Sequence, residues 1–150
     1  MTARMGNPAM VVPGALQALL ALGDAEKATG ISETVLELVH LRASQINGCG
    51  VCLHMHARAL RKAGESDDRI DTVAGWRDSP FFTDEERAAL ALTEAVTRLA
   101  DRADPVPDEV FEEAAAHYDE QQLGALVLSI AHINLWNRLN ATTHQVAGAY

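Results

Sequence analysis

Residues 37–56 read Glu37-Leu-Val-His-Leu-Arg-Ala-Ser-Gln-Ile-Asn-Gly-Cys-Gly-Val-Cys-Leu-His-Met-His56. Apolar side chains in the first half recur at helical spacing, and Ser32 lies where it can cap the start of a helix. Asn47-Gly48 is a helix stop signal, and a new helix is expected to begin near Cys49 and run to Ala63. The stretch therefore predicts two helices joined by a tight turn, which would pack as an antiparallel hairpin.

Helical patterns also fill the rest of the chain, and no segment alternates polar and apolar residues as a strand does. The other expected helices are one opened by Pro13-Gly14, then about Asp67–Arg77, Thr83–Ala100, Pro107–Tyr118, Asp119–Leu139 and a shorter tail. We therefore expect an all-α fold, a compact bundle of about seven or eight helices with no sheet. Residues 1–150 should form a single domain.

The composition supports this fold class and excludes several functions. Of 150 residues, 26 are alanine, which favours helices, and only 5% are aromatic, a type that favours strands. The net charge of −9 argues against a nucleic-acid partner and against binding to a membrane surface. No apolar run reaches the roughly 20 residues of a membrane-spanning helix. Pro13-Gly14 interrupts the one run that resembles a signal peptide, so we expect a cytoplasmic protein.

The candidate chemistry lies in the first turns of the helix expected from Cys49. At about 100° per residue, Cys49, Cys52 and His56 fall within a wedge of about 60°, whereas His54 points elsewhere. A helix N-terminus and a neighbouring imidazole both favour a thiolate, which is the reactive form of cysteine. Glu37, on the preceding helix, could approach and orient His56 across the hairpin. These four residues can form a nucleophile, base and orienting group.

Other interpretations of the same residues stay open. The two cysteines could be an inert buried pair, or they could bind zinc together with His56 and a fourth ligand. That fourth ligand would be His40, His54 or Glu37. The remaining histidines have no acidic or cysteine partner at helical spacing, so we expect them to be structural or at the surface: His117, His132 and His144.

The pattern Glu37, Cys49, Cys52, His56 resembles the carboxymuconolactone decarboxylase superfamily, in its alkylhydroperoxidase D-like (AhpD-like) branch. The segments that flank this pattern, and the segment Trp76–Glu94, resemble the same branch. The likeness extends over roughly residues 10–145. One departure is Val51, which stands where the best-known members carry a histidine between the two cysteines.

The resemblance implies an all-α fold assembled as trimers or hexamers, and a peroxide-reducing dithiol centre that needs no cofactor or metal. By this resemblance Glu37 and His56 would relay a proton while one cysteine attacks a hydroperoxide and the other resolves the product to a disulfide. The position of His56 favours Cys52 as the attacking thiol, whereas the helix dipole favours Cys49. A dithiol reductant, lipoyl- or thioredoxin-like, would restore the thiols.

Two other functions compete with this one. A lactone enzyme of the carboxymuconolactone decarboxylase type would act without the two cysteines. A non-catalytic oligomer that senses redox state or binds zinc would use the same residues without turnover. The absence of histidine at position 51 would simplify the proton relay and weaken a peroxidase.

Overall fold

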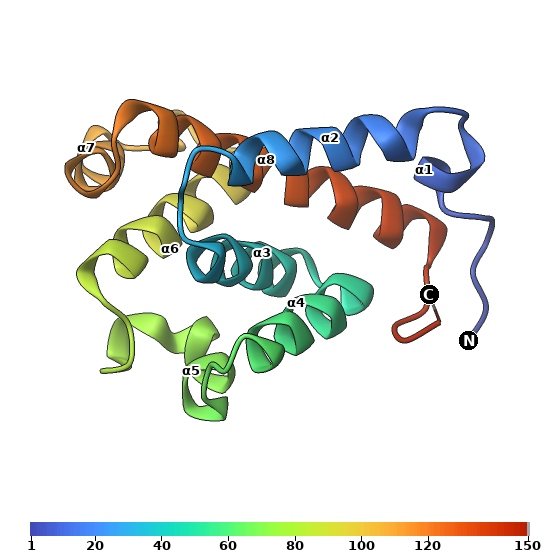
Figure 1. Ribbon diagram of the computed structural model, residues 1–150, viewed down its shortest axis with the longest axis horizontal. Helices are drawn as coiled ribbons and strands as arrows, with labels where there is room; N and C mark the ends of the chain where they lie inside the picture. The colour runs from blue at the N-terminus through green and yellow to red at the C-terminus, as the bar shows by residue number, and fades with distance from the viewer. Residues whose placement is uncertain (150) are drawn as a thin grey trace.

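The computed structural model describes residues 1–149, which form eight α-helices, one 3-10 helix and no strand (Figure 1). The elements are α1 (Pro8–Val11), α2 (Ala15–Lys27), α3 (Glu33–Asn47), α4 (Gly50–Lys62), α5 (Asp67–Thr72), η1 (Val73–Asp78), α6 (Asp84–Thr97), α7 (Asp108–His117) and α8 (Glu120–Thr143). This architecture confirms the all-α prediction and the expected number of helices.

Helix α3 is the centre of the fold and packs against α4, α6 and α8 (Figure 1). The Ser32 side chain accepts a hydrogen bond from the Val35 amide and so caps its first turn. Gly48 ends the helix in the left-handed region at φ 66°, a conformation that glycine adopts without steric cost. Cys49 then caps α4, and the predicted hairpin forms.

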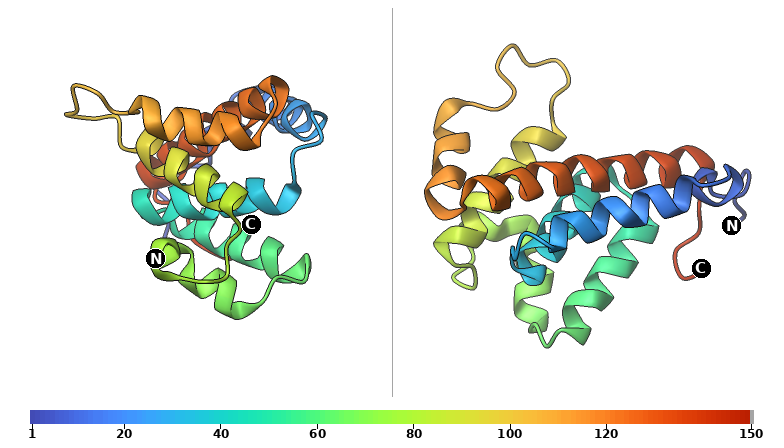
Figure 2. Two further views of the ribbon diagram at one scale, coloured as in Figure 1. Left: turned by 90° about the vertical axis from the view of Figure 1, so that its left-hand side faces the viewer. Right: turned by 45° about the horizontal axis from the view of Figure 1, so that its top comes forward.

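Helix α8 is the longest element and runs beside α2 in both views of Figure 2. A capping box between Asp119 and Gln122 starts it as expected. It continues unbroken to Thr143, so the prediction of a helix ending at Leu139 with a separate tail was wrong. A side-chain network holds α8 to the end of α3: the amide of Asn47 donates to two asparagines of α8 at 2.9 Å each.

One local expectation was also wrong, and one short helix had not been predicted. The helix predicted over Asp67–Arg77 divides into α5 and η1, because the backbone leaves the α-helical region at Thr72 (φ −97°, ψ 4°) and again at Gly75 within η1 (φ −109°, ψ 29°). The short helix α1 was not predicted, since four residues carry too little periodicity to be recognised. The Asn7 side chain caps α1 by accepting a hydrogen bond from the Ala9 amide at 3.0 Å.

The buried apolar residues form two main clusters that share α3 and α6. One includes Val39 and Ile130, and the other includes Leu60 and Leu90. Between α3, η1 and α6 lies the buried carboxylate of Glu94, which pairs with the guanidinium groups of three arginines: Arg42, Arg77 and Arg98. Within residues 1–149, none of the helices has the length and apolar character needed to cross a membrane.

Candidate active site

The hairpin of α3 and α4 brings the four sequence-predicted residues to one side of the bundle. Cys49 is the N-cap of α4, Cys52 lies in its first turn, and His56 lies one turn further on. Glu37 extends from α3, and its Oε2 lies 2.8 Å from Nδ1 of His56. Both side chains of this pair are partly exposed, at 25% for Glu37 and 16% for His56. The carboxylate therefore fixes the imidazole while solvent and small molecules can still reach it.

Cys49 and Cys52 are joined by a disulfide, with their Cα atoms 5.4 Å apart. The amide Nδ2 of Asn140, from α8, lies 3.3 Å from the Cys52 sulfur and 3.8 Å from the Cys49 sulfur. Asn7 donates to Oδ1 of Asn140 at 2.8 Å, which turns the Asn140 NH₂ group towards the sulfurs. A thiolate at either cysteine would accept a hydrogen bond from this amide. Asn140 is a candidate site residue that sequence reasoning missed.

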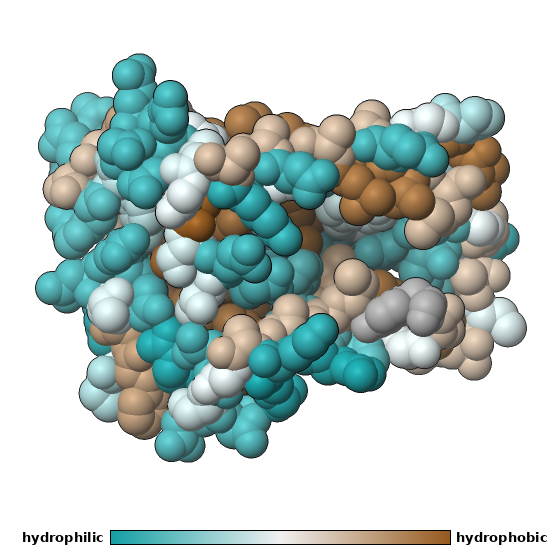
Figure 3. All heavy atoms as spheres, viewed as in Figure 1, coloured by the Kyte–Doolittle hydropathy of each residue, from teal (hydrophilic) through white to brown (hydrophobic). Residues whose placement is uncertain are grey.

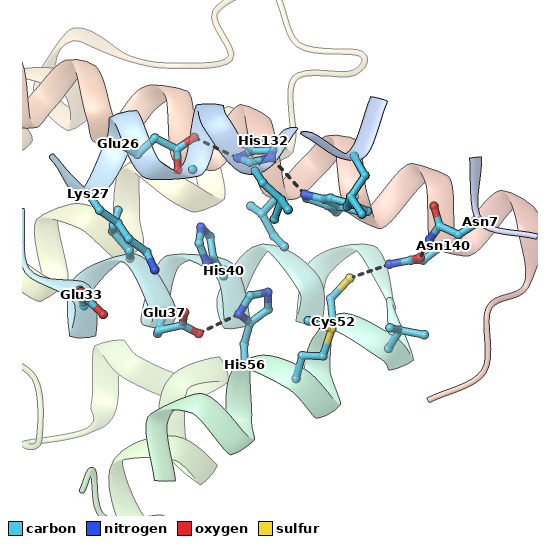
Figure 4. Close-up of a pocket in the computed structure, with 18 of the residues that line it drawn as sticks. Asn7, Glu26, Lys27, Glu33, Glu37, His40, Cys52, His56, His132 and Asn140 are labelled. Carbon is cyan, nitrogen blue, oxygen red and sulfur yellow. Dashed lines mark hydrogen bonds and ion pairs between the residues drawn. The ribbon is translucent and has the colours of Figure 1, made fainter. Parts of the chain in front are cut away.

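An apolar cavity of about 410 Å³ opens beside these residues, and Figure 3 shows the surface hollowed between α2 and α4. Its apolar lining includes Leu16, Leu20, Leu36, Val51, Ile133 and Trp136. Cys52, Glu37 and His56 all line this cavity (Figure 4). Cys49 lines a different recess, beside Gly48 and Ala141. The two cysteines are thus distinguished by what they face.

His40 lies next to His56, with the two ring centroids 4.7 Å apart. Its Nε2 is 2.6 Å from Oγ of Ser129, and its Nδ1 is buried without a hydrogen-bond partner among residues 1–149. Burial, the largest cause, and the neighbouring His56 hold the pKa of His40 well below its ordinary value of 6.5. His40 is therefore a neutral imidazole at physiological pH.

A second carboxylate–imidazole pair lies on the opposite wall of the cavity (Figure 4). Glu26 of α2 is 2% exposed, and its Oε1 lies 3.0 Å from Nδ1 of His132. Nε2 of His132 accepts a hydrogen bond from the indole of Trp136, so its ring proton must be on Nδ1. The expectation that His132 lacks an acidic partner was wrong, because Glu26 is 106 residues away in the chain. His117 also has an acidic partner, Glu113 on the preceding turn of α7.

The fold and the site together define a helical protein with a Cys-x-x-Cys disulfide centre beside a carboxylate–imidazole pair. The model of the carboxymuconolactone decarboxylase family matches residues 13–95, and the chain belongs to this family. The uncharacterized protein YdfG of Bacillus subtilis is 38% identical over 130 residues, which cover 87% of each chain. YnjA of Escherichia coli, also uncharacterized, is 34% identical over 77% of this chain and 62% of its own length.

The chain lies in the AhpD-like branch of the superfamily. The alkyl hydroperoxide reductase AhpD of Bradyrhizobium diazoefficiens is 44% identical over 44 residues, or 29% of this chain and 24% of that protein. Among solved structures, ATU0492 of Agrobacterium tumefaciens, a protein of unknown function, has a TM-score of 0.89 at 34% identity over 99% of this chain and all of its own. The debrominase Bmp8 shares the fold, with a TM-score of 0.79 at 22% identity over 91% of this chain and 73% of its own.

Proposed function

We propose that the protein is a thiol-dependent reductase of organic hydroperoxides that cycles between a Cys49/Cys52 dithiol and its disulfide. The observation that carries this proposal is that Cys52 and the Glu37–His56 pair line one apolar cavity, within disulfide reach of Cys49. A nucleophile, a proton carrier and a resolving thiol are the three parts that such a reaction needs.

In the first step, His56 takes the proton of the Cys52 thiol, and the thiolate attacks the terminal oxygen of the hydroperoxide. A sulfur–oxygen bond forms while the oxygen–oxygen bond breaks, so Cys52 is oxidised to a sulfenic acid. The alkoxide that leaves receives the proton from His56 and departs as an alcohol. Glu37, 2.8 Å from Nδ1 of His56, stabilises the imidazolium between these two transfers.

In the second step, Cys49 attacks the sulfur of the Cys52 sulfenic acid. The disulfide forms, the sulfur–oxygen bond breaks, and the oxygen leaves as water with the Cys49 proton. An external dithiol, lipoyl- or thioredoxin-like, then reduces the disulfide by thiol–disulfide exchange and is itself oxidised. Cys49 faces a different recess from the peroxide cavity, which supports the division of roles between the two cysteines.

The lining of the cavity favours an organic hydroperoxide over hydrogen peroxide. Most of the surface of its walls is apolar, and a volume of about 410 Å³ admits a substrate with several carbon atoms. The assembly into a trimer or hexamer implied by the resemblance stays a prediction. The exposed side chains of Val127, Leu128 and Leu135 on α8 are apolar surface that such an assembly would cover.

Glu37→Gln tests the proton relay. The substitution keeps the shape of the side chain and removes the charge that stabilises the His56 imidazolium. We expect the reaction of the reduced protein with cumene hydroperoxide to slow by roughly a hundredfold, a typical contribution of general acid–base catalysis. The rate is measured by stopped-flow under single-turnover conditions. Glu112→Gln, the same change on the exposed face of α7, is the matched control. A wild-type rate in Glu37→Gln would contradict the relay.

Asn140→Ala tests the hydrogen bond to the sulfurs. Hydrogen bonds to charged groups contribute about 1.5–3 kcal/mol, and a sulfur acceptor lies at the weak end. We therefore expect the Cys52 thiolate to be less stable and the peroxide reaction at neutral pH to slow by about tenfold. The pH profile of thiol reactivity should move to higher pH. Asn7→Ala, which removes the group that orients Asn140 together with the cap of α1, should move the profile less in the same direction. An unchanged profile in Asn140→Ala would exclude this role.

A further inference from the structure

We propose that Glu37, His40 and His56 form a binding site for a divalent transition-metal ion, for which Zn²⁺ is the best match, and that the bound ion inhibits the protein. The inhibition rests on the proposed function, because the ion would occupy the proton relay. The binding of the ion is independent of that function.

The three side chains already converge. One ligand atom from each lies within 4.8 Å of the other two. Glu37 and His40 are three residues apart on α3 and so share a helix face, while His56 reaches them from α4. Zinc binds nitrogen and oxygen ligands tetrahedrally at about 2.0–2.2 Å, so two ligands of one ion lie about 3.4 Å from each other. Small side-chain rotations close the remaining gap.

His40 is prepared for this role in two ways. Ser129, which is fully buried, contacts its Nε2 at 2.6 Å and so fixes the ring, as the second hydrogen bond of a metal-binding histidine generally does. Its Nδ1 is buried and has no hydrogen-bond partner in the part of the chain that the structure describes. Buried polar atoms are nearly always paired, and a metal ion at the cluster would give this nitrogen a partner.

The chemistry of the site favours zinc over other ions. Two imidazoles and one carboxylate, with a fourth position open to the cavity, form a ligand set typical of zinc, whereas calcium and magnesium prefer oxygen ligands. The cavity lining carries three glutamates against one lysine, so it attracts a cation. The sulfurs of Cys49 and Cys52 are bonded to each other, so this site uses no thiolate. It therefore differs from the cysteine-containing zinc site considered from the sequence.

Inhibition follows from where the ion would lie. Nδ1 of His56 and Oε2 of Glu37 are 2.8 Å apart and share a proton. The ion would bind Nδ1 of His56 and the Glu37 carboxylate in place of that proton, and the neutral ring would then carry its one proton on Nε2. His56 could then no longer take the thiol proton and deliver it to the leaving alkoxide.

Binding is tested by calorimetric titration of ZnCl₂ into the oxidised, disulfide-bonded protein, in which the thiols cannot contribute. We expect one ion per chain, and at least about tenfold weaker binding in His40→Ala. His117→Ala removes an imidazole on α7, outside the cavity, and should bind like the parent. Equal affinity in His40→Ala and the parent, or no saturable binding by the parent, would overturn the site.

The two proposals fail separately. Zinc-saturated protein should reduce cumene hydroperoxide at least about tenfold more slowly, with recovery on addition of EDTA. Undiminished activity at zinc saturation would overturn the inhibition. The zinc-free protein could reduce no peroxide while the titration still shows zinc binding that depends on His40. That result would contradict the proposed function and support the metal site.

Discussion

Cys52→Ser is expected to abolish peroxide reduction, with a loss of more than about a thousandfold in the single-turnover rate. A serine hydroxyl does not ionise near neutral pH and cannot take up the peroxide oxygen as a sulfenic acid. Cys52 is also the cysteine that lines the apolar cavity together with His56. The rate of cumene hydroperoxide consumption by the pre-reduced variant measures the effect directly.

Cys49→Ser is the matched variant and should behave differently. It keeps the attacking thiol, so one equivalent of peroxide is still consumed, and a sulfenic acid accumulates that dimedone can trap. Steady turnover should be lost, because no second thiol closes the disulfide. The opposite pattern, in which Cys52→Ser consumes one equivalent of peroxide and Cys49→Ser consumes none, would make Cys49 the attacking thiol and Cys52 the resolving one. Lactone decarboxylation that survives in both variants would instead favour the lactone enzyme.

Glu94→Gln is expected to lower the free energy of unfolding by about 3 kcal/mol at neutral pH. Burial alone would raise the pKa of Glu94, but hydrogen bonds from Arg77, Trp76 and Arg42 outweigh burial and lower that pKa from 4.5 to about 2. The folded state therefore favours the carboxylate, and glutamine cannot supply its charge to the arginines. Urea unfolding at one fixed protein concentration measures the loss.

The pH dependence separates charge from packing at Glu94. Because the folded-state pKa is the lower one, the stabilisation is present above 4.5 and is lost as the pH falls from there towards 2. The difference in the free energy of unfolding between wild type and Glu94→Gln should shrink over the same pH range. Glu113→Gln, an exposed position on α7, should change stability by less than about 0.5 kcal/mol. A loss in Glu94→Gln that is equal at every pH would assign the effect to packing.

Most helices could be predicted from the sequence because their signals are local. Capping patterns lie within four residues of each other, as Thr83 with Glu86 does, and the structure has this capping box. The hairpin of α3 and α4 depends on Ser32 and Gly48 in the same local way. The change from α5 to η1 at Thr72 and the non-helical Gly75 within η1 were missed, since an isolated glycine within a helical pattern is often tolerated.

In the candidate site, too, the contacts between residues close in sequence could be predicted and those between distant residues could not. Glu37 and His56 could be paired in advance because they lie 19 residues apart on two helices joined by a short turn. The contacts of Asn140 with Cys52 and of Glu26 with His132 could not be predicted, because the partners lie 88 and 106 residues apart in the chain. Local periodicity contains no information on which distant helix packs against which, so the hydrogen bonds that α8 makes to the cysteines and to α2 emerge only from the fold.

The central claim is that a hydroperoxide converts the Cys49/Cys52 dithiol to its disulfide. The most direct test counts thiols and measures mass on the fully reduced protein, before and after one equivalent of cumene hydroperoxide. We predict that two thiols and the mass of two hydrogen atoms are lost within seconds to minutes, with no such loss in Cys52→Ser. Thiols that remain unreactive for an hour would contradict the account.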